Sequence, residues 1–121
     1  MTTAAQILTA IVALLHFYFM VLEMFLWTTP FGQKTFRRTA AQQQETKVLA
    51  ANQGLYNGFL AAGLIWSAYA KTGAFDTRVF FLICVVIAGL YGGATAAKSI
   101  FVVQALPGAL ALAVTVAAHF A

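Results

Sequence analysis

The apolar residues of this chain fall in four long blocks, not in the short alternating runs that are typical of a soluble domain. The blocks cover about residues 4–27, 47–70, 76–97 and 99–120, and each is long enough for a helix to cross the hydrocarbon layer of a bilayer. We therefore predict an all-α integral membrane protein. Its four spans would form a four-helix transmembrane bundle, and residues 1–121 would make a single transmembrane domain.

Composition supports this class and limits where chemistry can occur. The chain has 121 residues, of which 62% are hydrophobic and 8% are charged, so little chain remains outside four spans of roughly 20 residues. The first block is not expected to be a cleaved signal peptide, because residues 1–5 carry no lysine or arginine and the block is too long. Cys84 is the only cysteine, which excludes an intrachain disulfide.

Seven basic residues flank the spans unevenly and predict the orientation. Five lie on the side of the first loop and two on the opposite side: Lys34, Arg37, Arg38, Lys47 and Lys98 against Lys71 and Arg78. By the positive-inside rule, loop 28–46 is cytoplasmic and both termini are on the non-cytoplasmic side. The net charge of +4 then reflects topology and contact with the lipid bilayer, and no nucleic-acid partner is expected.

Loop 28–46 is the one segment between spans that is large enough for a structure of its own. Phe31 and Phe36 interleave with Lys34 and Arg37, a pattern typical of a short interfacial helix. A solvated loop that serves only as a topology signal explains the same residues equally well.

Glu23 is the only acid inside the first span, where a carboxyl group is costly and marks a functional site by default. Burial disfavours the charged form, so we expect a neutral carboxyl that can exchange a proton. His16, seven residues earlier, lies on the same helical face nearer the midplane.

Other polar residues fall at compatible depths when residues are counted from the cytoplasmic end of each span, at about 1.5 Å of rise per residue. We predict one polar cluster with two tiers. The shallow tier comprises Glu23, Asn52, Gln53, Thr95 and Gln104, and the deeper tier comprises His16, Asn57 and Tyr91. Pro107 with Gly108 could kink the fourth span beside this cluster or could simply be tolerated.

Helical phase separates polar from small residues on the second and third spans. On the second, Asn52, Gln53, Tyr56 and Asn57 occupy an arc of about 140°. The small residues lie broadly opposite the polar ones on both spans: Gly54, Gly58 and Ala62 on the second, Gly89, Gly93 and Ala97 on the third. Because small residues let helices approach closely in lipid, we predict that the second and third spans pack together.

Three classes of function fit this cluster. The leading hypothesis is binding of a small amphipathic or cationic molecule at Glu23, coupled to proton exchange as in a small transporter. An enzyme or isomerase acting on a lipid-like or quinone-like substrate could instead use His16 and Glu23 as acid and base. In a structural or accessory subunit, the polar groups would only join helices.

Other chemistry has no support in the sequence. It contains no Ser/His/Asp arrangement and no metal-binding spacing, so neither a metal nor another cofactor is expected. Four short spans enclose little volume, and a homodimer would enlarge the site.

Two stretches carry a family resemblance. With His16, residues 22–27 (LEMFLW) and 52–64 (NQGLYNGFLAAGL) resemble the bacterial membrane family known as domain of unknown function 1304. The resemblance covers essentially the whole chain and implies a four-span, multi-pass protein of the bacterial inner membrane. It implies no activity, substrate or catalytic residue.

Overall fold

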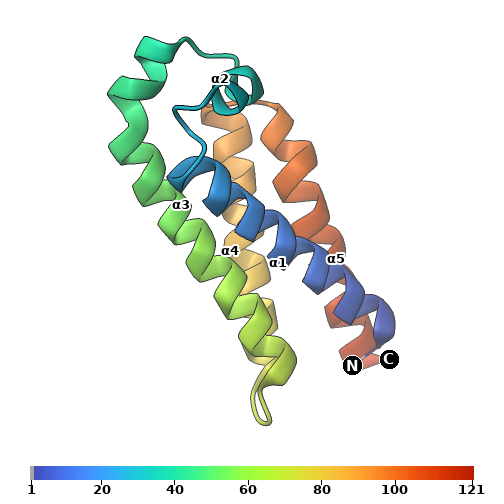
Figure 1. Ribbon diagram of the computed structural model, residues 1–121. Coiled ribbons are helices and arrows are strands. Elements are labelled where there is room, and N and C mark those ends of the chain that lie inside the picture. The colour runs from blue at the N-terminus through green and yellow to red at the C-terminus, as the bar shows by residue number, and fades with distance from the viewer. Residues whose placement is uncertain (1) are drawn as a thin grey trace. The chain divides into compact units, whose positions relative to one another are not determined.

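A computed structural model describes residues 2–121, and in this part of the chain every regular element is a helix. The elements, in order, are α1 (Thr3–Met24), α2 (Pro30–Phe36), α3 (Ala40–Tyr69), α4 (Ala74–Thr95), the π-helix η1 (Phe101–Ala105) and α5 (Leu106–Phe120) (Figure 1). The prediction of an all-α protein is confirmed.

Three helices of the described part are long and apolar enough to cross a membrane. They are α1, α4 and the continuous helix Phe101–Phe120 that η1 and α5 form together. These helices support a membrane protein and correspond to the first, third and fourth predicted spans.

Helix α3 differs from the predicted second span because it begins at Ala40, within the predicted loop. A reciprocal cap starts it: the Gln42 N–H donates to Thr39 Oγ1 (3.2 Å), and the Thr39 N–H donates to Gln42 Oε1 (3.0 Å). This capping box satisfies two backbone donors that a helix start leaves free. The added turns are rich in glutamine, and their polarity lowers the mean hydropathy of α3.

The short helix α2 confirms the helical interpretation of the first loop. The Thr29 side chain caps it by accepting from the Gly32 N–H (3.2 Å), and Pro30 occupies the first turn. Arg37 ends the helix in the left-handed conformation, with φ 53°. The rest of the predicted loop is therefore short, since α3 begins three residues after Arg37.

The described chain divides into two compact units. We call the first the core unit; it consists of the residues up to Leu15 together with Leu60–Ala121. The second, the loop unit, is His16–Phe59 and contains the end of α1, α2 and the first part of α3. That residues 1–121 act as a single transmembrane domain stays a prediction.

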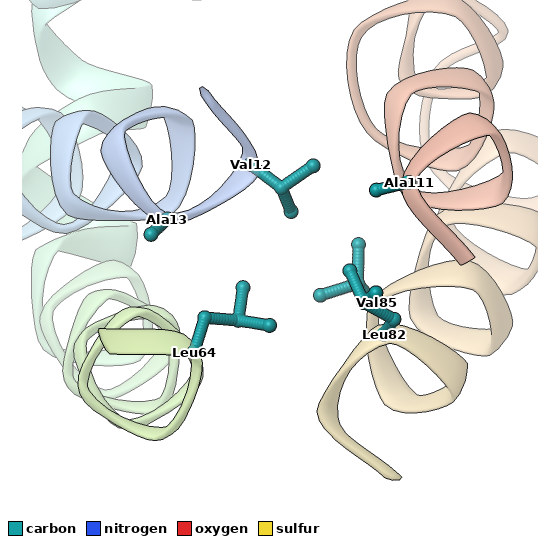
Figure 2. Close-up of a cluster of buried hydrophobic side chains, with 6 residues drawn as sticks. All are labelled: Val12, Ala13, Leu64, Leu82, Val85 and Ala111. Atoms are coloured by element: carbon teal, nitrogen blue, oxygen red, sulfur yellow. The ribbon is translucent and has the colours of Figure 1, made fainter. Parts of the chain in front are cut away.

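Apolar side chains from four helices hold the core unit together (Figure 2). The cluster consists of Val12 and Ala13 of α1, Leu64 of α3, Leu82 and Val85 of α4, and Ala111 of α5, each at most 5% exposed. Their small and medium sizes let the helices approach closely, which favours van der Waals packing.

Helix α4 and the η1–α5 helix run antiparallel in the core unit (Figure 1), and Phe75 near the start of α4 stacks on His119 near the end of α5 at 3.7 Å. At the other end, Gly89 lies against the backbone of Ala105, where an added Cβ would be 2.7 Å from the Ala105 nitrogen. Gly93 is buried against Phe101. Both glycines thus pack α4 on η1.

The π-helix η1 is the irregularity at the predicted kink. Pro107 has no N–H and its ring conflicts with the carbonyl four residues earlier. The Leu106 N–H donates to the Phe101 carbonyl oxygen, five residues earlier, whereas in an α-helix the acceptor lies four residues earlier. The wider turn carries Gln104, whose Nε2 donates to the Val85 carbonyl oxygen (3.1 Å).

The second and third predicted spans do pack together, since Gly63 of α3 lies against the Phe81 ring of α4. They do not do so through the two predicted small-residue faces. The nearest neighbours of Gly54 are Met20, Glu23 and Met24 of α1, not residues of α4. Gly58 also lies against Met20. Ala62 and Ala97, the alanines of the two predicted faces, are exposed. Small residues specify that a close neighbour exists, but any helix with a fitting surface satisfies them.

Candidate binding pocket at Glu23

Glu23 lies in the last turn of α1 and is held against α3 within the loop unit. Asn57 of α3 donates from Nδ2 to Glu23 Oε1 at 2.5 Å. Gly54 makes this approach possible, because a Cβ there would lie 3.0 Å from the Glu23 Cβ and 2.7 Å from the Met24 Cγ. The structure therefore joins Glu23 of the predicted shallow tier to Asn57 of the predicted deeper tier, and these two residues do not lie in separate tiers.

Asn57 is the buried member of the predicted polar face, and the other three members are exposed. The exposed side chains are Asn52, Gln53 and Tyr56. At about 100° per residue, Asn57 is about 60° from Gly54, whereas Asn52 is about 160° from it. Asn57 therefore shares the α1-facing side of α3, and Asn52 points away from α1.

A pocket of about 330 Å³ lies beside Glu23. Its walls are Glu23, Met24, Phe25, Trp27, Thr28, Lys47, Val48 and Ala51, all of them in the loop unit. The lining is mainly apolar and includes one acidic and one basic side chain. This composition suits an amphipathic molecule with a charged group.

Trp27 forms a wall of the pocket that several contacts hold in place. Gln43, which is fully buried, donates from Nε2 to the Trp27 carbonyl oxygen (2.9 Å). The Trp27 indole N–H donates to Thr46 Oγ1 (3.1 Å), and the ring packs on Phe36 with centroids 4.6 Å apart. The indole is thus preorganised, and its face can attract a cation.

His16 does not share this pocket. It is fully buried, and its ring lies edge-on to Phe19 with centroids 5.2 Å apart. It is not among the residues that line the space beside Glu23.

The remaining predicted site residues lie in the core unit. Tyr91 and Thr95 are exposed, and Thr95 Oγ1 donates to the Tyr91 carbonyl oxygen of its own helix (2.7 Å). Gln104 is engaged with the Val85 carbonyl. The hydrogen bonds within the described chain therefore join Glu23 to Asn57 and give Thr95 and Gln104 backbone partners.

Residues 10–116 match the protein family described as "Protein of unknown function (DUF1304)". The chain belongs to the DUF1304 family. It is also 30% identical over 122 residues to the uncharacterised protein YpaA of Lactococcus lactis subsp. lactis (strain IL1403), covering 99% of this chain and 100% of the relative. No solved structure matches the chain. The predicted family is confirmed, and the match includes the entire pocket.

In this DUF1304 protein, Gln43 holds the Trp27 wall and Lys47 lines the pocket, and neither was predicted as a site residue from the sequence. Gln43 lies seven residues before Ala50 and eleven before Gly54, and this helical spacing places all three on one buried face. That spacing could have identified Gln43. Lys47 precedes Ala51 by one turn, but its charge is equally typical of a topology signal.

Arg78 of this DUF1304 protein was also interpreted only as a topology signal. The structure buries it to 2% exposure, with Nε donating to Ser67 Oγ (3.3 Å). Ser67 in turn donates to the Leu64 carbonyl oxygen (2.6 Å). No sequence pattern distinguishes this arginine from Lys71, which is exposed in the connection between α3 and α4.

Proposed function

We propose that this DUF1304 protein is a multi-pass protein of the bacterial inner membrane. Residues 47–69 of α3 would form the second of its four spans, in addition to the three apolar helices described above. Helix α3 has 30 residues, or about 45 Å of length, which exceeds the ~30 Å of a hydrocarbon core. Its polar first turns would then lie outside the bilayer. Residues 48–69 contain no charged side chain, which supports this placement.

The distribution of basic residues supports a cytoplasmic α2 and non-cytoplasmic termini. Reporter domains fused after Ala40 and after Ala121 test this orientation. We expect the first reporter on the cytoplasmic side and the second on the opposite side. Two cytoplasmic reporters would contradict it.

Within this arrangement, we propose that the pocket binds a small amphipathic cation through Glu23. The observation that carries this proposal is that one carboxyl group both accepts from Asn57 and lines a pocket of about 330 Å³. Asn57 fixes the carboxyl, the apolar walls accept an alkyl or aromatic portion, and Trp27 offers its π-face to the cation.

Proton exchange would couple this binding to transport. A carboxyl at this depth is costly as an isolated anion, so an arriving cation would take the place of the carboxyl proton. We expect proton release when a cation is added to the purified protein, measured with a pH-indicator dye in weak buffer. Release of equal size from Glu23→Gln would contradict the coupling.

The pocket favours binding over the enzyme hypothesis, because Glu23 lines it and His16 does not. An acid and a base must both reach one substrate. Chemical change of a bound lipid-like or quinone-like molecule, lost in both His16→Ala and Glu23→Gln, would reverse this preference.

The decisive experiment compares wild type with Glu23→Gln, purified gently in a maltoside detergent. Native mass spectrometry and solvent extraction would detect a co-purifying molecule, and added dodecyltrimethylammonium would serve as a defined probe. We expect at least about tenfold weaker probe binding in the variant, because it lacks the anion that attracts the cation. The glutamine oxygen can still accept from Asn57, so folding should be retained.

Glu45→Gln is the matched control, since Glu45 is an exposed acid of α3 that does not line the pocket. It makes the same change of charge and should bind the probe as wild type does. Equal binding by wild type and Glu23→Gln would refute the cation site. An empty wild type together with a less stable variant would instead favour a structural or accessory role.

We also propose a homodimer through the outer face of α3. Asn52 and Gln53 are exposed there, and amides exposed to lipid are unfavourable unless they are paired. An amide both donates and accepts, so this face can pair with its own copy about a two-fold axis. Native mass spectrometry should show dimers in wild type and mostly monomers in a variant with leucine at both positions.

A further inference from the structure

We propose that the Glu23 pocket selects an amphipathic zwitterion whose ammonium group adjoins its apolar portion and whose anionic group lies further out, at Lys47. This inference rests on the proposed cation site and adds the charge order of the ligand. It assigns to Lys47 a role in ligand selectivity beyond that of a topology signal.

One acidic and one basic side chain line the pocket, and no ion pair joins them within residues 2–121. Glu23 and Lys47 both line it, and the hydrogen bond of Glu23 within the described chain goes to Asn57. Opposite charges facing one space attract a molecule that carries the complementary pair.

The two charges lie at different levels along α3. Glu23 is level with Gly54, because their side-chain positions would be 3.0 Å apart. Lys47 is seven residues nearer the start of α3, which corresponds to about 10 Å along the helix axis. The flexible lysine stem can shorten this gap, and a few bonds between the ligand's charged groups would span the rest.

The surroundings define which charge lies further out. Lys47 is exposed and follows the polar turn Gln42–Thr46, whereas the residues after it are uncharged up to Tyr69. Lys47 therefore marks the polar end of the pocket and Glu23 its apolar end. We expect the apolar portion of the ligand to enter the pocket first. The ammonium group then reaches Glu23 only if it is attached directly to this apolar portion.

The aromatic wall suits the same ligand. Gln43, Thr46 and Phe36 hold Trp27, and Phe25 also lines the pocket. Aromatic faces bind quaternary ammonium groups well because no hydrogen bond is required. An alkylated ammonium next to an alkyl chain fits this wall and the carboxyl together.

Three dodecyl probes test the charge order. In dodecyl sulfobetaine the ammonium is bonded to the chain and the sulfonate is outermost; in dodecylphosphocholine the phosphate is bonded to the chain and the ammonium is outermost. Dodecyltrimethylammonium carries the cation alone. Each is titrated at the same mole fraction into maltoside-solubilised protein carrying Trp66→Phe. Trp27 is then the only tryptophan and reports on the pocket by fluorescence, while native mass spectrometry counts bound probe.

We expect wild type to prefer the sulfobetaine to the phosphocholine. Lys47→Gln should weaken sulfobetaine binding about threefold, as for a partly exposed ion pair, and should tighten dodecyltrimethylammonium binding because a like charge is removed. Lys34→Gln is the matched control, since Lys34 is exposed on α2 and does not line the pocket. It should change neither affinity.

The outcomes separate this inference from the cation site on which it rests. If dodecyltrimethylammonium binds wild type and not Glu23→Gln, the cation site stands. Equal affinities for the two zwitterions, or a Lys47→Gln variant that behaves as wild type does, would then overturn the charge order alone. If wild type and Glu23→Gln bind dodecyltrimethylammonium alike, the cation site itself is refuted, and the charge order falls with it.

Discussion

The core unit and the loop unit use their polar side chains differently. In the core unit, Gln104 and Ser67 donate to backbone carbonyls and Arg78 donates to Ser67. In the loop unit, Gln43 likewise donates to a backbone carbonyl, but the Glu23 carboxyl both accepts from Asn57 and faces a pocket. A polar residue in a span therefore does not by itself indicate a site. A ligand requires a polar group that is held by one partner and still borders open space.

Glycine contributes to both units, with different neighbours. In the core unit, Gly89 meets the backbone of η1, which cannot move aside easily. In the loop unit, Gly54 meets the side chains of Met24 and Glu23, which can adjust. The core unit should therefore tolerate changes of volume less well than the loop unit.

The largest effect we expect is on the core unit, from Gly89→Val. The new Cβ would lie 2.7 Å from the Ala105 nitrogen, and the free energy of unfolding should fall by about 3 kcal/mol. Thermal unfolding in detergent measures this change. Ala88→Val, at the exposed neighbouring position, should have little effect. Equal stability of the two variants would contradict the close contact between α4 and η1.

Asn57→Leu addresses the loop unit and should cost about 1–2 kcal/mol, because the Glu23 carboxyl loses its donor. Dodecyltrimethylammonium binding should also weaken several-fold, since the carboxyl is no longer oriented. Asn52→Leu is the matched change at an exposed amide of the same helix. It should lower the fraction of dimer and leave the affinity of each protomer for dodecyltrimethylammonium unchanged. The same loss of affinity in both variants would refute the role of the Glu23–Asn57 pair.

Gln43→Leu should have a smaller effect on stability, about 1 kcal/mol, because the Trp27 carbonyl loses one donor. The more informative measurement is the fluorescence anisotropy of Trp27 in the Trp66→Phe background, which should fall as the indole becomes mobile. Gln44→Leu changes the exposed neighbour and should leave the anisotropy unchanged. A rigid Trp27 in Gln43→Leu would show that Phe36 and Thr46 are sufficient.

Thr115→Val should give the smallest change, of opposite sign. Thr115 is fully buried, and its hydroxyl has no hydrogen-bond partner among residues 2–121. Valine of similar shape removes this unpaired group, so stability should rise by about 0.5–1 kcal/mol. Thr9→Val is the matched comparison, since the Thr9 hydroxyl donates to the Ala5 carbonyl oxygen (2.8 Å), and it should not stabilise. A gain from both variants would mean that hydrogen bonding is not the cause.

Much of the fold could be predicted from the sequence. The apolar blocks predict α1, α4 and the helix Phe101–Phe120, because long apolar helices need only local hydrogen bonds and a lipid environment. Phe31 and Phe36 among basic residues favoured the helix that became α2. The Thr39–Gln42 capping box was present in the sequence as well, and recognising it would have placed the start of α3 correctly.

Within the site, the sequence by itself determined the candidate carboxyl but not its partner. Glu23 stands out because it is the only acid in its span. Counting residues placed Asn57 in the deeper tier, whereas the structure bonds it directly to Glu23. Helical phase is a property of one helix and can be read from spacing along the chain, whereas the relative depth of residues on two helices depends on how those helices pack.

Only the tertiary structure decided which polar residues meet. It selected Asn57 over Asn52, placed Gly54 against α1, and brought Lys47 and Glu23 to one pocket. It also buried Arg78, which no sequence pattern distinguishes from the exposed Lys71. The physical reason is that the pairing of helix faces depends on the fit of side chains from distant segments, and no single helix encodes its partner.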